Sequence, residues 1–363
     1  MIDIAFPTEL KKIQNILVVG PAWIGDMMMA HTLIQLLKQR NPVAQIDVLA
    51  SGWTRQLLMR MPEVNHVIEM PIGHGSFAFG ERRALGKSLA QHRYDQAIVL
   101  PNSFKSAFIP FFADIPLRTG WRGEMRYGLL NDIRVLDKKR YPLMVQRYAA
   151  LAFPKANEPL NEFPYPRLTV DQYQRPQLLT KFALQLNRPL LIICPGAEYG
   201  PAKRWPEHYF AEVADKKIRA GWQVWLMGSA KDCEVTDAIR QLLLDDEREY
   251  CFNLAGSTNL GEAIDLMDCA DAVLSNDSGL MHIAAALQKS LAVIYGSTSP
   301  EHTPPLAQRV SIISNKIECA PCFERECPKV HHKCLRELMP QQVIAALDAL
   351  TAQTAVLQMD SNG

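Results

Sequence analysis

The 363-residue sequence has no long apolar run and almost no net charge. None of its windows approaches the roughly 18 uninterrupted apolar residues that a membrane-spanning helix needs. The first residues, MIDIAFPTELKK, lack the basic-then-apolar pattern of a secretory signal. The net charge of +1 indicates no general field for nucleic acid, so an anionic partner must meet a local patch. We therefore expect a cytoplasmic protein that contacts membranes only at its surface and binds no nucleic acid.

Three motifs for nucleotides and metals are also absent. No G-x-G-x-x-G follows the first apolar run, which disfavours a dinucleotide-dependent oxidoreductase. The full P-loop pattern G-x-x-x-x-G-K-[ST] is absent, because the G-K-S at Gly86–Ser88 has Glu81 where the first glycine would stand, which disfavours a P-loop NTPase. No D-x-D pair occurs, so the sequence does not indicate a metal ion on a bound diphosphate. We therefore expect no cofactor for catalysis.

Strand and helix patterns alternate along the chain. Its length predicts two domains of roughly 150 residues, and its 48% hydrophobic and 21% charged residues are typical of globular domains. Apolar, β-branched runs predict strands at Ile16–Val19, Ile46–Ala50, Ala97–Leu100, Leu190–Cys194, Val224–Gly228, Ala272–Asn276 and Leu291–Gly296. Helical periodicity predicts helices at Asp26–Arg40, Glu81–His92, Phe104–Phe112, Trp205–Ala220, Val235–Leu244, Leu260–Cys269, Ser278–Leu287 and Pro340–Leu357.

A proline-rich stretch, with Pro154, Pro159, Pro164 and Pro166, divides this α/β chain. Each half opens with a strand, a Pro/Gly loop and a helix, so we predict two Rossmann-like domains whose parallel sheets face each other across a cleft. The predicted parts are an N-terminal extension (1–12), a first domain (13–165), a linker (166–187), a second domain (188–340), and a C-terminal helix and tail (341–363). We expect the last helix to pack back on the first domain.

The stretch from Ile16 to Met29, ILVVGPAWIGDMMM, predicts a buried strand, a glycine-bearing loop and a helix that opens at Asp26. Ligands of open α/β sheets bind at the carboxyl ends of strands, so Asp26 is expected at a ligand site. A carboxylate there can act as a general base. The alternative is structural, because Asp is a common helix cap and complements the helix dipole.

Two segments of the second half predict an anion site. In PGAEYGPAKRWP (Pro195–Pro206), Lys203 comes just before a helix, where cations and helix N–H groups can bind phosphate. In LSNDSGLMH (Leu274–His282), a strand ends and either Asp277 or Ser278 caps the next helix. The alternative for the first segment is a solvated basic turn. A lone helical histidine such as the one that ends the second segment is more often a core residue than a functional one.

These segments belong to a longer set of motifs. In chain order they are GPAWIGDMMM (Gly20–Met29), RMPEVN (Arg60–Asn65), GHG with GERR (Gly73–Arg83), LPNSFKSA (Leu100–Ala107), RTGWRGEMRYGLLND (Arg118–Asp132), PGAEYGPAKRWP (Pro195–Pro206) and NDSGLMHIAAAL (Asn276–Leu287). Through these motifs, which span most of the chain, the sequence resembles the lipopolysaccharide heptosyltransferases of glycosyltransferase family 9. The middle motifs are most similar to those of members that add the second heptose of the inner core.

The resemblance implies a GT-B fold, with the acceptor on the first domain and ADP-heptose on the second. It implies inverting, metal-independent transfer of heptose from ADP-L-glycero-D-manno-heptose to the first heptose of heptosyl-Kdo2-lipid A, at the cytoplasmic face of the inner membrane. Asp26 matches the family's proposed catalytic base, and Lys203 matches its lysine at the diphosphate. The implied donor-binding loop and helix contribute Asp277, Ser278, Gly279, Leu280 and His282.

The acceptor implied by the resemblance carries carboxylates and phosphates, which require cations. Residues 101–150 contain nine Lys or Arg and four Asp or Glu, a local excess of +5. The candidate acceptor contacts are Lys105, Arg118, Arg122 and Arg126, with Trp121 among them to stack on a sugar. The alternative is a solvated charged loop.

Other functions remain open from the sequence. Heptosyltransferases of the first or third type would act on a different core acceptor. A nucleotide-dependent oxidoreductase is disfavoured by the missing fingerprint. A non-enzymatic nucleotide-sugar sensor would bind the same donor without turnover.

A cysteine-rich segment, residues 319–334, stands apart from these motifs. Cys319, Cys322, Cys327 and Cys334 have close spacing, with His331 and His332 before the last of them. Closely spaced thiols in a cytosolic chain are typical of a structural zinc site. The spacing is irregular for common zinc modules, so reduced thiols or a disulfide are equal alternatives.

Overall fold

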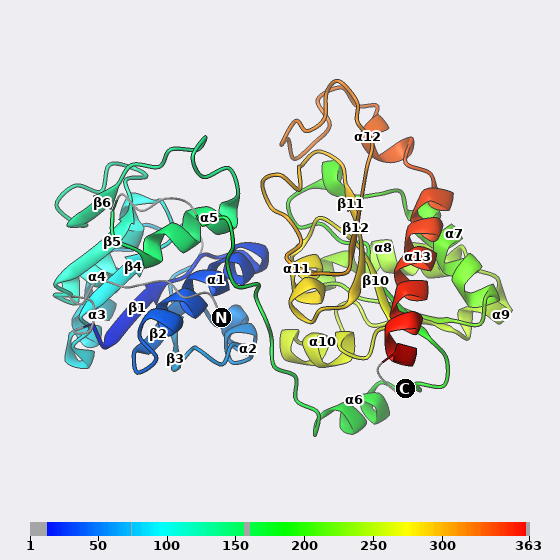
Figure 1. Ribbon diagram of the computed structural model, residues 1–363, viewed down its shortest axis with the longest axis horizontal. Helices are drawn as coiled ribbons and strands as arrows, with labels where there is room; N and C mark the ends of the chain where they lie inside the picture. The colour runs from blue at the N-terminus through cyan, green and yellow to red at the C-terminus, as the bar shows by residue number, and fades with distance from the viewer. Residues whose placement is uncertain (1–12, 74, 156–159, 361–363) are drawn as a thin grey trace. The chain divides into compact units, whose positions relative to one another are not determined.

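The computed structural model describes residues 13–73, 75–155 and 160–360, and the chain divides into two compact units between Pro166 and Arg167. The predicted extension (1–12) and the last residues of the predicted tail (361–363) lie outside the described residues. Over the described ranges, each unit contains one six-stranded parallel sheet with helices packed against it (Figure 1). The predicted α/β class with two parallel sheets is confirmed.

The first unit orders its strands β3-β2-β1-β4-β5-β6. The strands are β1 (Asn15–Val19), β2 (Gln45–Ser51), β3 (His66–Met70), β4 (Gln96–Val99), β5 (Leu117–Trp121) and β6 (Asp132–Arg134). The helices are α1 (Ile24–Arg40), α2 (Arg55–Leu58), α3 (Phe79–Leu89), α4 (Phe108–Phe112) and α5 (Met144–Ala149), with a 3-10 turn η4 (Phe104–Ala107). Helix α1 packs against α5, and α3 packs against α4.

The second unit orders its strands β12-β11-β10-β7-β8-β9. The strands are β7 (Leu190–Cys194), β8 (Gln223–Leu226), β9 (Cys251–Asn253), β10 (Ala272–Asn276), β11 (Ser290–Tyr295) and β12 (Val310–Ser314). The helices are α6 (Arg175–Lys181), α7 (Glu207–Arg219), α8 (Cys233–Gln241), α9 (Asp245–Arg248), α10 (Leu260–Met267), α11 (Gly279–Ala286), α12 (Lys333–Arg336) and α13 (Pro340–Asp360), with a 3-10 turn η6 (Pro201–Lys203).

The two sheets share one topology. Counted from the start of its own unit, each runs 3-2-1-4-5-6. The direction of winding therefore reverses between β1 and β4 in the first unit and between β7 and β10 in the second. Ligands of doubly wound sheets bind at the carboxyl ends of these two strands, where the connections leave to opposite sides.

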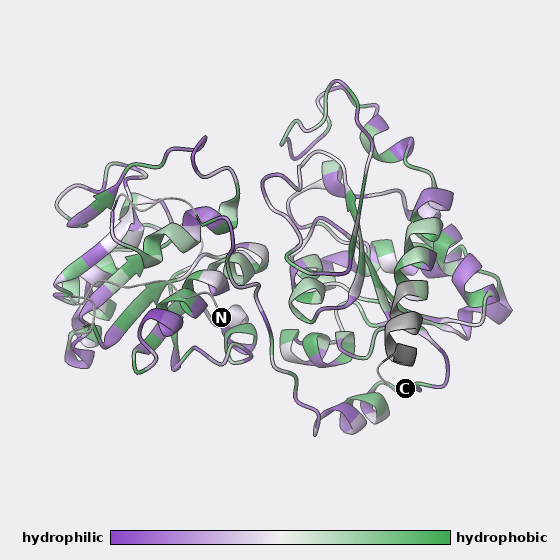
Figure 2. Cartoon of the chain, in the orientation of Figure 1, coloured by the Kyte–Doolittle hydropathy of each residue, from purple (hydrophilic) through white to green (hydrophobic). Residues whose placement is uncertain are grey.

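The predicted strands are the ones buried on both faces. All five residues of β7, LLIIC, are buried, as are all of β10, and continuous apolar runs are typical of buried parallel strands. Figure 2 shows hydrophobic colour concentrated in the sheets, with mixed colour on the surrounding helices. Five strands were not predicted, and each is only partly buried: β3, β5, β6, β9 and β12. All of them except β5 lie at a sheet edge.

Helix α13 belongs to the second unit, and its expected contact with the first domain remains a prediction. It packs against β11, α7 and β12. Val343, Leu347 and Leu350 are buried in the same core as Trp205. Lys217 of α7 adds an ion pair with Asp348 at 2.6 Å. The helical periodicity of this segment predicted an apolar face on the helix, but it could not predict which of the two sheets that face packs against.

The predicted linker, residues 166–187, also lies in the second unit, apart from Pro166 at the boundary. The backbone N–H of Asp171 donates to Asp265 at 2.8 Å. Arg175 of α6 pairs with Asp268 at 2.5 Å, next to α10. Helix α6 packs against α10, so this stretch is held by specific polar contacts. None of the helices in the described ranges is both long and apolar enough to cross a membrane.

Arg126 is a structural residue of the first unit. Its side chain is fully buried, and it donates to the carbonyl of Pro101 at 2.6 Å, to the hydroxyl of Ser106 at 3.1 Å and to the carbonyl of Trp121. Burial lowers its pKa to about 10, which still leaves it charged at neutral pH. The prediction that Arg126 contacts an acceptor is therefore wrong, because no part of it reaches solvent.

Replacing Arg126 by Met should destabilise the first unit by about 3 kcal/mol, because two buried carbonyls and a hydroxyl lose their donor. The control is Arg122→Met at an exposed position, which should cost less than about 0.5 kcal/mol. Chemical denaturation of the full chain measures both. Equal stability of the two variants would contradict the structural role.

Candidate functional site

The first unit has a cavity of about 690 Å³ at the carboxyl ends of its strands. Residues at the ends of β1, β2, β3 and β4 line it, and it therefore includes the point where the winding reverses. The wall contains Gly20, Ser51, Met70 and Pro101, each at or just after a strand end. This is the location that parallel-sheet topology reserves for ligands.

Gly20 sets the path from β1 to α1. Its N–H donates to the carbonyl of Leu49 at 2.9 Å, and a Cβ at this position would lie 2.6 Å from the Cε of Met27. Helix α1 then begins at Ile24, with Trp23 as its N-cap and no side-chain capping bond. Asp26 is therefore the third helical residue and does not occupy the capping position, so capping alone does not account for it.

Asp26 is partly exposed and lines the cavity. The hydroxyl of Tyr148, on α5, is hydrogen-bonded to its carboxylate. Burial first, and then the charge and hydrogen bond of Asp26, raise the pKa of Tyr148 well above its usual value of 10. The phenol therefore stays protonated and acts as a donor to Asp26. Asp26, the predicted base, therefore lines the same cavity as the residues at the ends of β1, β2, β3 and β4.

Two of the predicted acceptor contacts also line this cavity. Lys105 lies half-buried in η4, directly after β4 and its connecting loop. Trp121 ends β5 with 6% of its surface exposed, and its Nε1 donates to the carbonyl of Arg147 at 3.1 Å. A fixed indole and a cation at one wall are the groups that a charged sugar requires.

Arg118 and Arg122 are not among the residues that line the cavity. The guanidinium of Arg118 donates to the carbonyls of Leu129 at 2.6 Å and Ile115 at 2.5 Å, which fastens it to its own surroundings. Arg122 is exposed. Their contact with an acceptor remains a prediction.

Four further charged or titratable side chains of the cavity wall were not predicted: Arg82, Glu124, Arg147 and Tyr148. The guanidinium of Arg82 donates to the carbonyls of Phe77 and Ser76, at 2.8 and 3.1 Å. These side chains come from distant segments that only the folded sheet assembles. Arg82 and Glu124 lie within two of the motifs quoted above, but nothing local to either motif indicates that its side chain faces a cavity. Arg147 and Tyr148 lie outside those motifs.

The second unit brings Lys203 and Asp277 together at its own reversal point. Lys203 follows β7 and Asp277 follows β10, and their side chains form an ion pair of 2.6 Å. Thr298 also donates to the same carboxylate oxygen at 2.6 Å. Both charged side chains are largely buried, at 12% and 4% exposure. The lysine is thus held in a defined position at a strand end, which fits a fixed cation for a phosphate.

Ser278, not Asp277, caps helix α11. Its hydroxyl accepts from the N–H of Met281 at 3.4 Å. The first N–H groups of the helix, at Gly279 and Leu280, have no acceptor within the helix and carry its positive dipole end. An anion placed beside Lys203 would meet them.

His282 lies one turn into α11 and is 6% exposed. Burial lowers its pKa to about 4; Asp277 opposes that shift, and Lys203 adds to it. The imidazole is therefore neutral at physiological pH and adds no charge beside the lysine–aspartate pair.

Two residues of the quoted motifs to which the sequence assigned no role, Tyr199 and Asn276, hold the loop that carries Lys203. The amine of Lys203 lies 4.9 Å from the ring centre of Tyr199, whose hydroxyl donates to the carbonyl of Phe323 at 2.5 Å. Asn276 donates to the carbonyl of Pro195 at 2.7 Å and ties the loop to β10. The lysine is therefore positioned by contacts on both sides of its loop.

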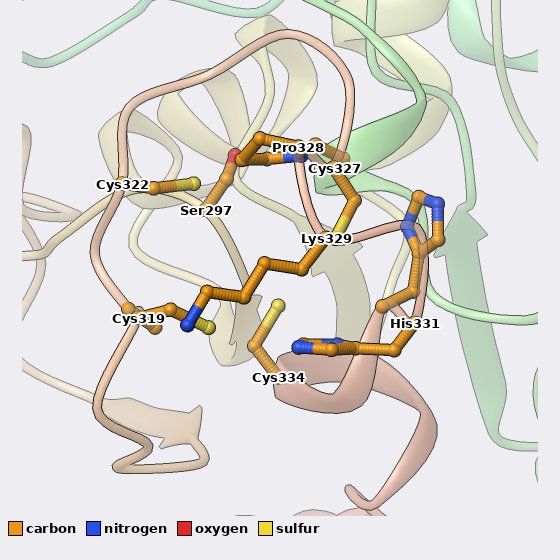
Figure 3. Close-up of a pocket in the computed structure, with 11 residues that line it drawn as sticks. Ser297, Cys319, Cys322, Cys327, Pro328, Lys329, His331 and Cys334 are labelled. Atoms are coloured by element: carbon orange, nitrogen blue, oxygen red, sulfur yellow. The ribbon is translucent and has the colours of Figure 1, made fainter.

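The cysteine-rich segment forms a small pocket of about 20 Å³ on this unit. The four thiols are unbonded to one another, and their side chains surround a shared space (Figure 3). Among the described residues, no group of three or more His, Cys, Asp or Glu side chains is already arranged to hold a metal. The segment also contacts the loop that carries Lys203, because the N–H of Ala202 donates to the carbonyl of Arg325 at 3.0 Å.

Comparison with known proteins identifies the family. The model of glycosyltransferase family 9 (heptosyltransferase) matches residues 82–333. The chain is 49% identical to lipopolysaccharide heptosyltransferase 2 of Salmonella typhimurium, with 94% of this chain and 100% of the relative covered. It is 52% identical to lipooligosaccharide heptosyltransferase 2 of Haemophilus influenzae, with 93% and 100% covered.

A solved structure agrees with this result. The ADP-heptose LPS heptosyltransferase II of Escherichia coli has a TM-score of 0.86 and 47% identity, with 94% of this chain and 100% of that chain covered. The two Rossmann-type units are those of the GT-B class that the sequence predicted. The chain belongs to glycosyltransferase family 9, the heptosyltransferases.

Proposed function

We propose that the protein transfers heptose from ADP-L-glycero-D-manno-heptose to the first heptose of the lipopolysaccharide inner core, with inversion and without a catalytic metal. Relatives that are about half identical over nearly the whole chain carry the name heptosyltransferase 2. The observation that carries the mechanism is Asp26 in a cavity at the strand ends of the first unit. A sugar-sized ligand fits a cavity of about 690 Å³.

The proposed reaction is one displacement. Asp26 takes the proton from the acceptor hydroxyl while that oxygen attacks the anomeric carbon from the face opposite ADP. The new C–O bond forms as the bond to the diphosphate breaks, and ADP leaves with the electron pair. Attack from the opposite face inverts the anomeric centre, and the proton stays on Asp26 until solvent removes it.

The leaving diphosphate is assigned to the second unit. Lys203 supplies a fixed positive charge, and the first N–H groups of α11 supply donors. Asp277 holds the lysine in place, and Ser278 fixes the helix start. These groups stabilise charge that grows as ADP departs, which is the task that a metal performs in other transferases.

Asp26→Asn should lower kcat by about 10³-fold, within the range for loss of a general base, with the KM for ADP-heptose nearly unchanged. Asp114→Asn, at an exposed position outside the cavity, is the matched control and should keep full activity. Release of ADP and formation of heptosylated product measure turnover. Normal heptose transfer by Asp26→Asn would show that the base is elsewhere.

The same assay identifies the acceptor. Product should form from mono-heptosylated Kdo2-lipid A and not from Kdo2-lipid A itself. Product from Kdo2-lipid A alone, with none from its mono-heptosylated form, would instead assign the enzyme to the first type of heptosyltransferase. Donor binding with no transfer to any core acceptor would support a nucleotide-sugar sensor.

We also propose that the first unit contacts the inner membrane at an aromatic patch, defined as Phe77, Phe79, Phe104 and Phe111. These rings are 37–53% exposed and pack around the rings of Phe108 and Phe112. Phe77 and Phe104 also line the cavity, so the patch continues from its wall onto the surface. A lipid-linked acceptor keeps its acyl chains in the bilayer, since exposing each CH2 costs about 0.8 kcal/mol.

Cations flank this patch. The guanidinium of Arg83 lies 6.0 Å from the ring centre of Phe112, and that of Arg118 lies 5.6 Å from the ring centre of Phe111. Aromatic rings beside cations are typical of surfaces that bind anionic membrane interfaces. Glu81 and Asp114 are also exposed nearby, so the rings supply most of the proposed attraction.

The double variant Phe79→Ser/Phe111→Ser changes the patch without touching the cavity wall. It should bind vesicles of phosphatidylglycerol and phosphatidylethanolamine about tenfold more weakly, because two apolar contacts are lost. Its activity on acceptor in those vesicles should fall equally, while activity on deacylated, water-soluble acceptor stays normal. The control is Leu242→Ser/Leu244→Ser, two leucines that are each 58% exposed in the second unit.

Unchanged vesicle sedimentation of the phenylalanine variant would contradict the membrane proposal. A shift from dimer to monomer with vesicle binding intact would show that the patch joins two copies of the chain. Equal loss of activity on both acceptors would indicate damage to the cavity.

We propose finally that the cysteine-rich segment binds a structural zinc ion. Four thiols are the donor set that zinc prefers. Burial and the three neighbouring cysteines raise the pKa of Cys334, which reflects how closely the four sulfurs are grouped. Since the thiols are not yet arranged around a metal position, the segment must tighten when it binds the ion.

Elemental analysis of the purified protein should find about one zinc per chain. Cys322→Ser should remove it, whereas Cys233→Ser, outside the segment, should not. Because the segment holds Ala202 beside Lys203, loss of zinc should also raise the KM for ADP-heptose. Metal-free protein with eight titratable thiols, or with a disulfide in the segment, would exclude the zinc site.

A further inference from the structure

Helix α5 places a buried hydroxyl on the proposed base. Helices α1 and α5 pack against each other, and Tyr148 and Asp26 line the same cavity from these two helices. Tyr148 is 5% exposed, and its hydroxyl is hydrogen-bonded to the Asp26 carboxylate. A buried tyrosine has few rotamers, so the position of its hydroxyl is well defined.

Helix α5 is itself fastened at the cavity wall. The guanidinium of Arg147 donates to the carbonyls of Tyr141 at 2.9 Å and Pro142 at 3.2 Å. The carbonyl of Arg147 accepts from the indole of Trp121 at 3.1 Å. Arg147, the residue next to Tyr148, is therefore anchored through both its side chain and its backbone. This anchoring also limits the movement of the Tyr148 hydroxyl.

The direction of the hydrogen bond is set by burial. Because burial and the Asp26 carboxylate raise the pKa of Tyr148 well above its usual value, the phenol keeps its proton throughout the working pH range. It donates to the carboxylate and does not accept a proton from the acceptor. A hydrogen bond donated to an ionised carboxylate favours the charged form.

We propose that Tyr148 is a positioning residue, whose hydroxyl holds one oxygen of Asp26 and so aims the carboxylate at the acceptor hydroxyl. The inference rests on the proposed function, in which Asp26 is the base. The hydrogen bond limits the rotamers of the Asp26 side chain, because a carboxylate on a helix otherwise samples several of them. A base held in one orientation is better aligned with its substrate.

Other charges face the same cavity and bear on its pH dependence. Among the described residues that line it, these are Arg82, Lys105, Glu124 and Arg147. Three are cations and one is an anion, so their sum also favours ionised Asp26. They are untouched in a variant that removes only the phenolic oxygen, which isolates the effect of the hydrogen bond.

The test is Tyr148→Phe, measured as kcat and KM against pH. We expect kcat to fall about tenfold, with both KM values nearly unchanged, because the ring still fills its place. We expect the acidic limb of the kcat profile to move up by about one pH unit, since Asp26 loses a bond that favours its charged form.

Tyr94→Phe is the matched control. The hydroxyl of Tyr94 donates to buried Asp47 at 2.6 Å in the same unit, but neither residue lines the cavity. This variant loses the same kind of bond, so it should lower stability and leave the pH profile of kcat unchanged. A shift of the profile in both variants would show a general effect of stability.

The double variant Asp26→Asn/Tyr148→Phe completes the test. If Tyr148 acts through Asp26, the double variant should be no slower than Asp26→Asn alone. A normal kcat and a normal pH profile in Tyr148→Phe would overturn the inference and leave Asp26 as the base. Full activity in Asp26→Asn would instead overturn the proposed function.

Discussion

Both candidate sites depend on one constraint of doubly wound parallel sheets. Loops at the carboxyl ends of the strands diverge only where the winding reverses, so a ligand can reach the sheet there. In the first unit this point lies between β1 and β4, which lead to Asp26 and Lys105. In the second it lies between β7 and β10, which lead to Lys203 and Asp277. One topology thus presents a carboxylate in one unit and a fixed cation in the other.

Burial decides which charged groups serve a ligand and which serve the fold. Arg126 is fully buried and bound to carbonyls of its own chain, so it stabilises the unit. Lys105 comes from the same basic stretch but faces the cavity. Lys203 lies between these cases, because Asp277 neutralises part of its charge and also fixes its position. The cost of burying that pair is offset if a diphosphate later completes its surroundings.

The sequence predicted what local pattern determines. Continuous apolar runs marked the central strands, and the loop glycine marked the entry to α1. The strands β3, β5, β6, β9 and β12 were missed because partly exposed strands lack such runs. The partner of α13, the burial of Arg126 and the arrival of Tyr148 at Asp26 depend on contacts between distant segments. Composition cannot distinguish these residues from exposed ones of the same type.

The central claim is that Asp26 accepts the proton of the attacking hydroxyl. The most direct measurement is a crystal structure of the full chain with a non-transferable ADP-heptose analogue and the mono-heptosylated acceptor. The account predicts the acceptor hydroxyl within about 3.2 Å of an Asp26 oxygen, which is the reach of a general base. An acceptor hydroxyl bound instead to Glu124, or to no carboxylate of the cavity, would contradict it.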